Sequence, residues 1–92
     1  MCIRDRRSLR EALLEGFSEL RRGDSLDGVV SAIRSMEDSG NFNAGIGSVP
    51  NAKGLVEMDA GLMDGKSLKA GAVASVRYPR NPIDLALSLI HI

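Results

Sequence analysis

The stretch FNAGIGSVPNAKGLVEMDAGLMDG, residues 42–65, holds five of the ten glycines in this 92-residue chain. Glycine adopts positive φ without steric cost and lets other groups approach the backbone closely. Tight loops are therefore expected here rather than a continuous helix, with the flanking sequence folding around them.

The same stretch predicts a β-hairpin from its alternation of turn residues and apolar residues. Residues 48–49 would form a short extended piece, residues 51–54 a turn and residues 55–63 the returning strand. Glu57 and Asp59 lie two apart, so their carboxylates leave one face of that strand. A half-buried strand explains this spacing without any chemistry.

Downstream, Asp64 and Gly65 predict a turn into a further strand. Residues 69–76, KAGAVASV, are rich in small side chains, which predicts a buried central strand that another layer approaches closely.

Two helices are predicted before the glycine-rich stretch. Residues 7–23 begin with Ser8 and Glu11, the spacing of a capping box, and carry apolar residues at helical spacing. Asp24 or Ser25 caps the second helix, whose apolar positions repeat in the same way: Leu26, Val29, Val30, Ile33 and Met36. The short connection between them predicts an antiparallel pair.

A third helix is predicted to begin near the end of the chain. Asn81 suits the N-cap, Pro82 the first helical position and Asp84 the first turn.

The two ends of the chain are related at the level of DNA. MCIRDR can be written ATG TGT ATA AGA GAC AGN and LSLIHI as CTG TCT CTT ATA CAC ATN, the reverse complement of the first. This relation indicates translated adapter sequence. Residues 1–6 and 87–92 are therefore interpreted as adapter-like scars around a biological segment, residues 7–86. We expect both ends to pack on nothing, the first to be frayed and the second to prolong the third helix.

Composition narrows the function. Twelve Lys and Arg balance twelve Asp and Glu, so no nucleic-acid-binding surface is expected. No apolar run approaches the roughly 20 residues of a membrane span. Cys2 and His91, the sole cysteine and histidine, both lie in the adapter-like ends. A disulfide framework and a Cys/His zinc site are therefore not expected.

Four motifs, NAGIGSV, VEMDAGLMDG, SLKAGAVA and RNPI, resemble in order and spacing the plant-type asparaginases, also called isoaspartyl peptidases. The resemblance is close over residues 41–86 and looser over residues 9–40. Pro50, Gly61 and Ser75 depart from the family pattern, which has a larger apolar residue, a Ser or Cys, and a Gly there. Glycosylasparaginase is a related alternative that the motifs fit less well.

The resemblance implies an α+β fold, a partial αββα sandwich of the N-terminal-nucleophile hydrolase type. Its parts here would be a helix pair, a glycine-rich loop, a β-hairpin, a further strand and the start of a helix. Family members cleave themselves into α and β chains, and residues 7–86 would be a fragment of the α chain. An (αβ)₂ assembly and a cytoplasmic location are expected.

The resemblance also implies a reaction. An N-terminal threonine freed by autocleavage would attack the side-chain amide of L-asparagine or the isopeptide bond of a β-aspartyl dipeptide, with its own α-amine as base. No catalytic cofactor is implied. This chain contains no threonine, so it is expected to be inactive alone. A small interaction domain without catalysis is the alternative from another class.

Two site assignments follow from the resemblance. A structural sodium ion would be held by the main-chain carbonyls of Met36, Glu37, Ser39, Phe42, Ala44 and Ile46, which suits a cation that prefers oxygen. The alternative is a hydrogen-bonded loop without an ion. Asn43 would lie beside the nucleophilic threonine, and the alternative is an Asn that holds its own turn.

Two other sites are not supported by the pattern. The glycines of residues 45–47 lack the preceding strand and following helix of a phosphate-binding loop. Asp59 and Asp64 would diverge across a strand end, so they are not expected to act as paired acids.

Overall fold

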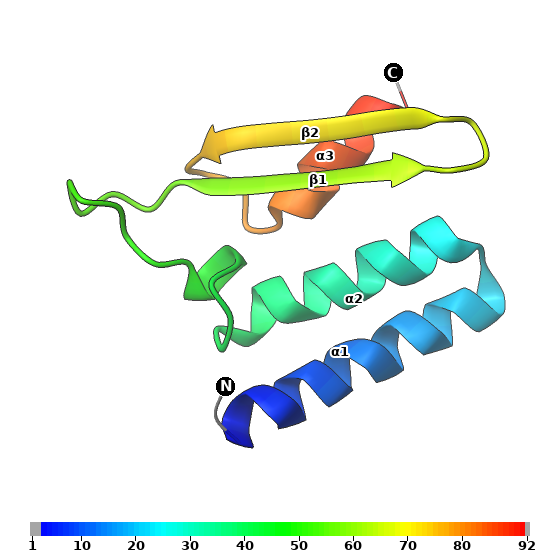
Figure 1. The fold of residues 1–92 in the computed structure, drawn as a ribbon, viewed down its shortest axis with the longest axis horizontal. Coiled ribbons are helices and arrows are strands. Elements are labelled where there is room, and N and C mark those ends of the chain that lie inside the picture. Colours follow the sequence, from blue (N-terminus) through cyan, green and yellow to red (C-terminus); the bar gives the residue numbers. More distant parts are fainter. Residues whose placement is uncertain (1–2, 92) are drawn as a thin grey trace.

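The order of helices and strands is that of an α+β fold. The computed structural model describes residues 3–91. Six elements follow one another (Figure 1): α1 (Ile3–Arg22), α2 (Ser25–Ser39), the 3₁₀-helix η1 (Gly45–Gly47), β1 (Met58–Asp64), β2 (Lys69–Val76) and α3 (Pro82–Ile90). The molecule is flat, with extents of 39 × 33 × 17 Å. No helix within residues 3–91 has the length and apolar character needed to cross a membrane.

The first two helices form the predicted antiparallel pair (Figure 1). They approach closely at two glycines. A Cβ on Gly16 would lie 3.0 Å from the carbonyl oxygen of Gly28, and a Cβ on Gly28 would lie 3.1 Å from that of Gly16. Ala12 and Val30 are buried in this contact region. Small residues therefore set the distance between the helices.

The ends of α2 follow local rules. Asp24, one of the two residues predicted for the cap, is the N-cap, and its carboxylate accepts a hydrogen bond from the main-chain N–H of Asp27 at 3.1 Å. The Asp27 carboxylate accepts the N–H of Asp24 in return at 3.2 Å, which completes a capping box. Gly40 ends the helix in the left-handed conformation, φ 75°.

The start of α1 corrects two expectations. The helix begins at Ile3, so residues 3–6 are helical rather than frayed. Met1 and Cys2 lie outside the described residues. Ser8 is therefore inside the helix and buried, and the capping box predicted for Ser8 and Glu11 is wrong. Three of the residues 3–7 are Arg, a good helix former, which favours extension of the helix upstream.

The hairpin is made by different segments from those predicted. β1 pairs antiparallel with β2, whereas residues 48–50 have no strand conformation. The predicted turn does form: Gly54 N–H donates to the carbonyl of Asn51 at 2.9 Å. The turn closes on itself, since Asn51 N–H donates to the carbonyl of Leu55 at 2.8 Å. Pro50 has no N–H and the N–H of Val49 is taken by the side chain of Asn43, so neither donor is available to a ladder.

The predicted turn at Asp64 and Gly65 does connect β1 to β2. The sheet within residues 3–91 has these two strands only, so the expectation that Lys69–Val76 is a buried central strand is wrong for the described chain.

A bulge interrupts the hairpin next to Asp59. Met58 pairs with Val76 and Ala60 with Val73, so two residues of β2 face one residue of β1. Ser75 takes φ 55° there, and its N–H donates to the Asp59 carboxylate at 2.8 Å. Positive φ favours glycine. The family pattern's Gly at this position thus has a local physical reason.

α3 packs against the hairpin through small residues of β2 (Figure 1). A Cβ on Gly71 would lie 3.3 Å from Cγ1 of Ile90 and closer still to the carbonyl oxygen of Ala86. Ile83, Ala86 and Ile90 are buried. The last residues do prolong the helix through Ile90, as predicted, but the burial of Ile90 shows that they do not pack on nothing.

The apolar stripe of α1 lies at the surface. Its exposed members are Leu9, Leu13, Leu14, Phe17 and Leu20, with exposed fractions from 38% to 64%. Within residues 3–91, neither α2 nor the hairpin covers this stripe.

Candidate functional site

The candidate site is the glycine-rich loop that follows α2. Gly45 takes φ 54°, and a Cβ there would lie 2.5 Å from both Cβ and the carbonyl oxygen of Glu37. A Cβ on Gly47 would lie 2.7 Å from the carbonyl oxygen of Gly40, and closer to that of Phe42. The loop therefore folds back on the end of α2 so tightly that side chains are excluded at both glycines.

Main-chain oxygens gather around these glycines. Two of the six predicted sodium ligands, the carbonyls of Glu37 and Phe42, lie against Gly45 and Gly47, and the carbonyl of Gly40, which was not predicted, lies beside them. The Met36 carbonyl accepts the Ser39 hydroxyl at 3.0 Å, and the Ala44 carbonyl accepts the N–H of Gly47 at 3.1 Å. The sodium set remains a prediction.

Asn43 holds the chain where it leaves the loop. Its side-chain oxygen accepts the main-chain N–H of Val49 at 2.8 Å, and the residue is exposed. This is the turn-holding contact that the sequence left open as an alternative. It leaves the NH₂ end of the amide as the end that could act on another group.

The loop is also tied to α1, which the sequence did not predict. Asn41 donates from its side-chain amide to the hydroxyl of Ser8 at 2.7 Å, and its main-chain N–H donates to the Ser39 hydroxyl at 3.2 Å. The available signal was a polar hydroxyl on the helix face that points to the partner helix, where apolar side chains are usual.

Below the loop, Glu37 joins α2 to the start of α3. The residue is 3% exposed. Its carboxylate accepts the side-chain amide of Asn81 at 3.2 Å and the main-chain N–H of Ile83 at 3.3 Å. Burial raises the pKa of the Glu37 carboxyl group, and the two hydrogen bonds oppose the rise. The sequence predicted only its carbonyl as functional.

Two ion pairs flank this contact. Arg34 of α2 pairs with Asp84 of α3 through Nε at 3.2 Å and through Nη2. The hydrogen bond to Asp84 raises the pKa of Arg34. Asp38 accepts the Asn81 amide at 3.0 Å and lies 3.4 Å from Nε of Arg80. Asn81 occupies the predicted N-cap position, but its side chain bonds to α2 instead of capping α3.

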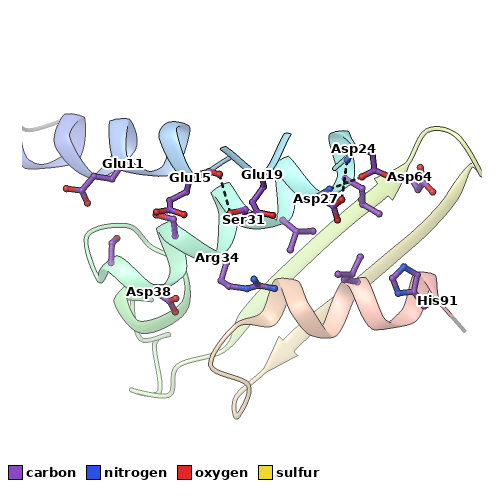
Figure 2. Close-up of a pocket in the computed structure, with 15 residues that line it drawn as sticks. Glu11, Glu15, Glu19, Asp24, Asp27, Ser31, Arg34, Asp38, Asp64 and His91 are labelled. Carbon is purple, nitrogen blue, oxygen red and sulfur yellow. Dashed lines mark hydrogen bonds between the residues drawn. The ribbon is translucent and has the colours of Figure 1, made fainter. Parts of the chain in front are cut away.

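A wide groove of about 780 Å³ runs between the helix pair and the α3 side of the molecule. Figure 2 shows carboxylates of the helix pair around it together with Asp64 of β1, and Arg34 reaching from α2 toward α3. Asn43 does not line it, and within residues 3–91 no cluster of His, Cys, Asp and Glu side chains could hold a metal ion. We therefore assign the candidate site to the glycine-rich loop and not to this groove.

Asp59 and Asp64 do not form a pair. Asp64 lines the groove, and its carboxylate also accepts the N–H of Lys66 at 3.1 Å in the turn. Asp59 is engaged with Ser75 in the bulge.

Comparison with known proteins places this chain in a family. A family model described as asparaginase matches residues 2–91. The chain is 53% identical over 78 residues to a plant-type L-asparaginase of Thermococcus kodakarensis, covering 85% of this chain and 26% of the relative. It is 52% identical over 79 residues to an isoaspartyl peptidase/L-asparaginase of Danio rerio, covering 85% of this chain and 26% of the relative.

A third relative matches over a longer stretch of the chain. A plant-type L-asparaginase of Pyrobaculum calidifontis is 47% identical over 87 residues, which covers 95% of this chain and 29% of the relative. The chain thus spans about a quarter of the length of the curated relatives it matches. With a family model matching nearly its whole length, the chain belongs to the asparaginase family of plant-type L-asparaginases and isoaspartyl peptidases.

Proposed function

We propose that residues 7–86 are part of the α chain of a hydrolase that releases ammonia from L-asparagine or cleaves β-aspartyl dipeptides. The observation that carries the proposal is the identity of about half over 78–79 residues to relatives bearing these two names. Those names favour this group over the glycosylasparaginase alternative. The active enzyme would be a cytoplasmic (αβ)₂ assembly in which the β chain comes from the same precursor.

The proposed reaction is an acyl transfer to an N-terminal threonine. The 92 residues contain no threonine, so this nucleophile and its α-amine base would belong to the β chain. Hydrogen-bond donors would stabilise the oxyanion of the tetrahedral intermediate. Residues 7–86 would line the active site beside the nucleophile.

Asn43 is the residue of this chain that we assign to the lining of the active site. Its side-chain oxygen accepts the N–H of Val49 at 2.8 Å, which holds one end of the amide. The NH₂ group could then donate to the threonine hydroxyl oxygen and orient its lone pair toward the substrate carbonyl. Holding the turn and orienting the nucleophile are thus compatible roles.

A structural sodium ion in the same loop fits the chemistry of the residues present. The carbonyls of Glu37, Gly40 and Phe42 crowd positions where only glycine fits, and main-chain oxygen suits a hard cation. When bound, the ion would stiffen the loop and take no part in bond making. Replacing choline chloride by sodium chloride at equal ionic strength should raise the melting temperature, and Gly45→Ala should abolish that rise. Equal melting in both salts would favour the loop without an ion.

The surface of α1 supports the proposed αββα sandwich. Its open apolar stripe includes Leu13, 64% exposed, and Phe17, 59% exposed. Contiguous apolar surface of this kind marks an interaction face. In the complete protein a sheet would cover it.

A graft tests the proposed function. The matching residues of the Thermococcus kodakarensis relative would be replaced by residues 7–86 of this chain, and ammonia release from L-asparagine and hydrolysis of a β-aspartyl dipeptide would be measured. We expect activity on at least one substrate within about tenfold of the ungrafted relative. A folded graft without either activity would favour the small interaction domain.

The isolated 92-residue chain is the corresponding negative control. Because the proposed nucleophile is absent, neither ammonia nor aspartate should be released above a buffer blank. Release that persists after Asn43→Ala and scales with protein concentration would refute the assignment of the nucleophile to the β chain.

A further inference from the structure

Glu37 is a buried group that the proposed chemistry does not use. Its side chain lies where the end of α2, the 3₁₀-helix η1 and the start of α3 meet, and it is 3% exposed. A carboxylate at such a position must be fully hydrogen-bonded to be tolerated. Its partners therefore show what it does.

On one side the carboxylate completes the N-terminus of α3. Pro82 has no N–H, and the N–H of Asp84 donates to the Asn81 carbonyl at 3.0 Å. Between these two residues, the N–H of Ile83 donates a hydrogen bond to Oε2 of Glu37 at 3.3 Å. The two residues are 46 positions apart in the sequence. An N-cap side chain usually accepts such a donor. Glu37 takes this role from another helix.

The residue in the N-cap position supports this reading. Asn81 makes no side-chain cap hydrogen bond. Its amide instead donates to Oε1 of Glu37 at 3.2 Å, so both carboxylate oxygens are engaged with the start of α3. The positive end of the helix dipole also favours a negative charge at this place.

On the other side, Glu37 contacts the glycine-rich loop through its backbone and Cβ. A Cβ added to Gly45 would lie 2.5 Å from these atoms, so no space separates the two residues. Glu37 thus contacts both the glycine-rich loop, which contains Asn43, and α3, which packs against the hairpin.

The neighbouring charges are weaker candidates for this role. The pair of Arg34 with Asp84 has side chains 46% and 44% exposed, and the pair of Arg80 with Asp38 has side chains 71% and 38% exposed. Exposed ion pairs contribute little because water and salt screen them. Glu37 is the buried member of the contact.

We propose that Glu37 is a positioning residue whose carboxylate caps α3 and fixes α3 with the hairpin in one place relative to the glycine-rich loop. The capping itself is independent of the proposed function, whereas any consequence for turnover rests on it. A test on the 92-residue chain therefore examines the capping role without depending on the proposed function.

The test measures the distance between the helix pair and the hairpin. In a Cys2→Ser background, spin labels at Ser18→Cys on α1 and Lys66→Cys in the hairpin turn report the distance distribution by pulsed electron spin resonance. Hydrogen exchange at the Ile83 amide is followed in parallel on the unlabelled chain. If Glu37 only adds stability, its replacement would lower the melting temperature. The distance distribution measured below the melting temperature would then stay unchanged.

Glu37→Ala should broaden the distance distribution and speed exchange at Ile83 by on the order of tenfold, the size of an N-cap loss. Helicity by circular dichroism should stay unchanged. Glu57→Ala is the matched control, because Glu57 pairs with Arg77 at 3.5 Å outside this contact. An unchanged distribution and exchange rate in Glu37→Ala, or the same change in Glu57→Ala, would overturn the proposal.

Two conservative variants keep the proposal testable if Glu37→Ala does not fold. Glu37→Gln retains an oxygen acceptor at full reach and should keep the narrow distribution. Glu37→Asp keeps the charge but is one methylene shorter, so it should broaden the distribution. The reverse order would show that charge, not capping reach, is what matters, and would count against the proposal.

Discussion

The hydroxyl oxygen of Ser8 accepts a hydrogen bond from the side-chain amide of Asn41 at 2.7 Å, across 33 positions of sequence. Ser8 is 6% exposed, on the face of α1 that points to α2. The contact fixes the beginning of the glycine-rich loop on the helix pair.

Ser8→Ala should therefore destabilise the chain although alanine is the better helix former. The lost hydrogen bond costs about 1 kcal/mol, whereas the gain in helix propensity is only about half of that. Ser18→Ala, on an exposed position of the same helix, should give the propensity gain alone. Thermal unfolding by circular dichroism measures both; equal effects of the two substitutions would mean that the Asn41 contact adds nothing.

Gly45 should be irreplaceable by alanine. A Cβ there would meet Glu37 at 2.5 Å, and the φ of 54° is itself unfavourable for a residue with a side chain. The left-handed conformation costs about 1–2 kcal/mol and overpacking about 1–3 kcal/mol more. Gly65→Ala is the control, because nothing lies within 4 Å of a Cβ at that position. Urea unfolding should show a large loss for Gly45→Ala and almost none for Gly65→Ala, and similar losses would contradict the tight loop.

Ser75→Gly should stabilise the hairpin. Ser75 sits at φ 55°, so glycine relieves about 1–2 kcal/mol of backbone strain and loses about 0.5–1 kcal/mol through the greater freedom of the unfolded chain. Ser48→Gly is the matched control at φ −62°, where only the loss applies. The melting temperature should rise for Ser75→Gly and fall for Ser48→Gly. A fall in both would mean that the bulge is not strained.

Local patterns predicted the parts of the fold that depend on local physics. The capping residue Asp24, the turn at residues 51–54 and Pro82 at the first turn of α3 each act through neighbouring backbone groups, and all three are confirmed. The antiparallel helix pair was also predictable, because a short connection leaves few other arrangements.

Two of the errors share a cause, which is that pairing between distant segments has a weak sequence signal. The hairpin was assigned to residues 48–63, although the bonding partner of β1 is β2. Asn81 was expected to cap its own helix, but Glu37 and Asp38 offered carboxylates that lie close only in the folded chain. Ser8 was assigned to a cap for another reason: the helix was expected to begin at residue 7, whereas it begins at Ile3 and leaves Ser8 free to bond to Asn41.

For the site, the family resemblance pointed to Asn43 and the loop, but not to the contacts that support them. The contacts of Asn43 with Val49 and of Gly45 with Glu37 are visible only in the structure. They show a tightly folded loop in which, within residues 3–91, the side-chain oxygen of Asn43 is hydrogen-bonded and its NH₂ group is not.

The most direct test of the account is the turnover number of the grafted relative carrying Asn43→Ala, compared with Asn51→Ala. Asn51 is the matched control, because its side-chain oxygen also holds a turn by accepting main-chain N–H groups, from Lys53 at 2.9 Å and Leu55 at 3.1 Å. Each variant should lose about 1 kcal/mol of stability. Only Asn43→Ala should also lower kcat, on the order of 10²-fold, because it removes a positioned donor at the acyl-transfer site. Equal kcat values in both variants would show that Asn43 only holds its loop and would contradict its place beside the nucleophile.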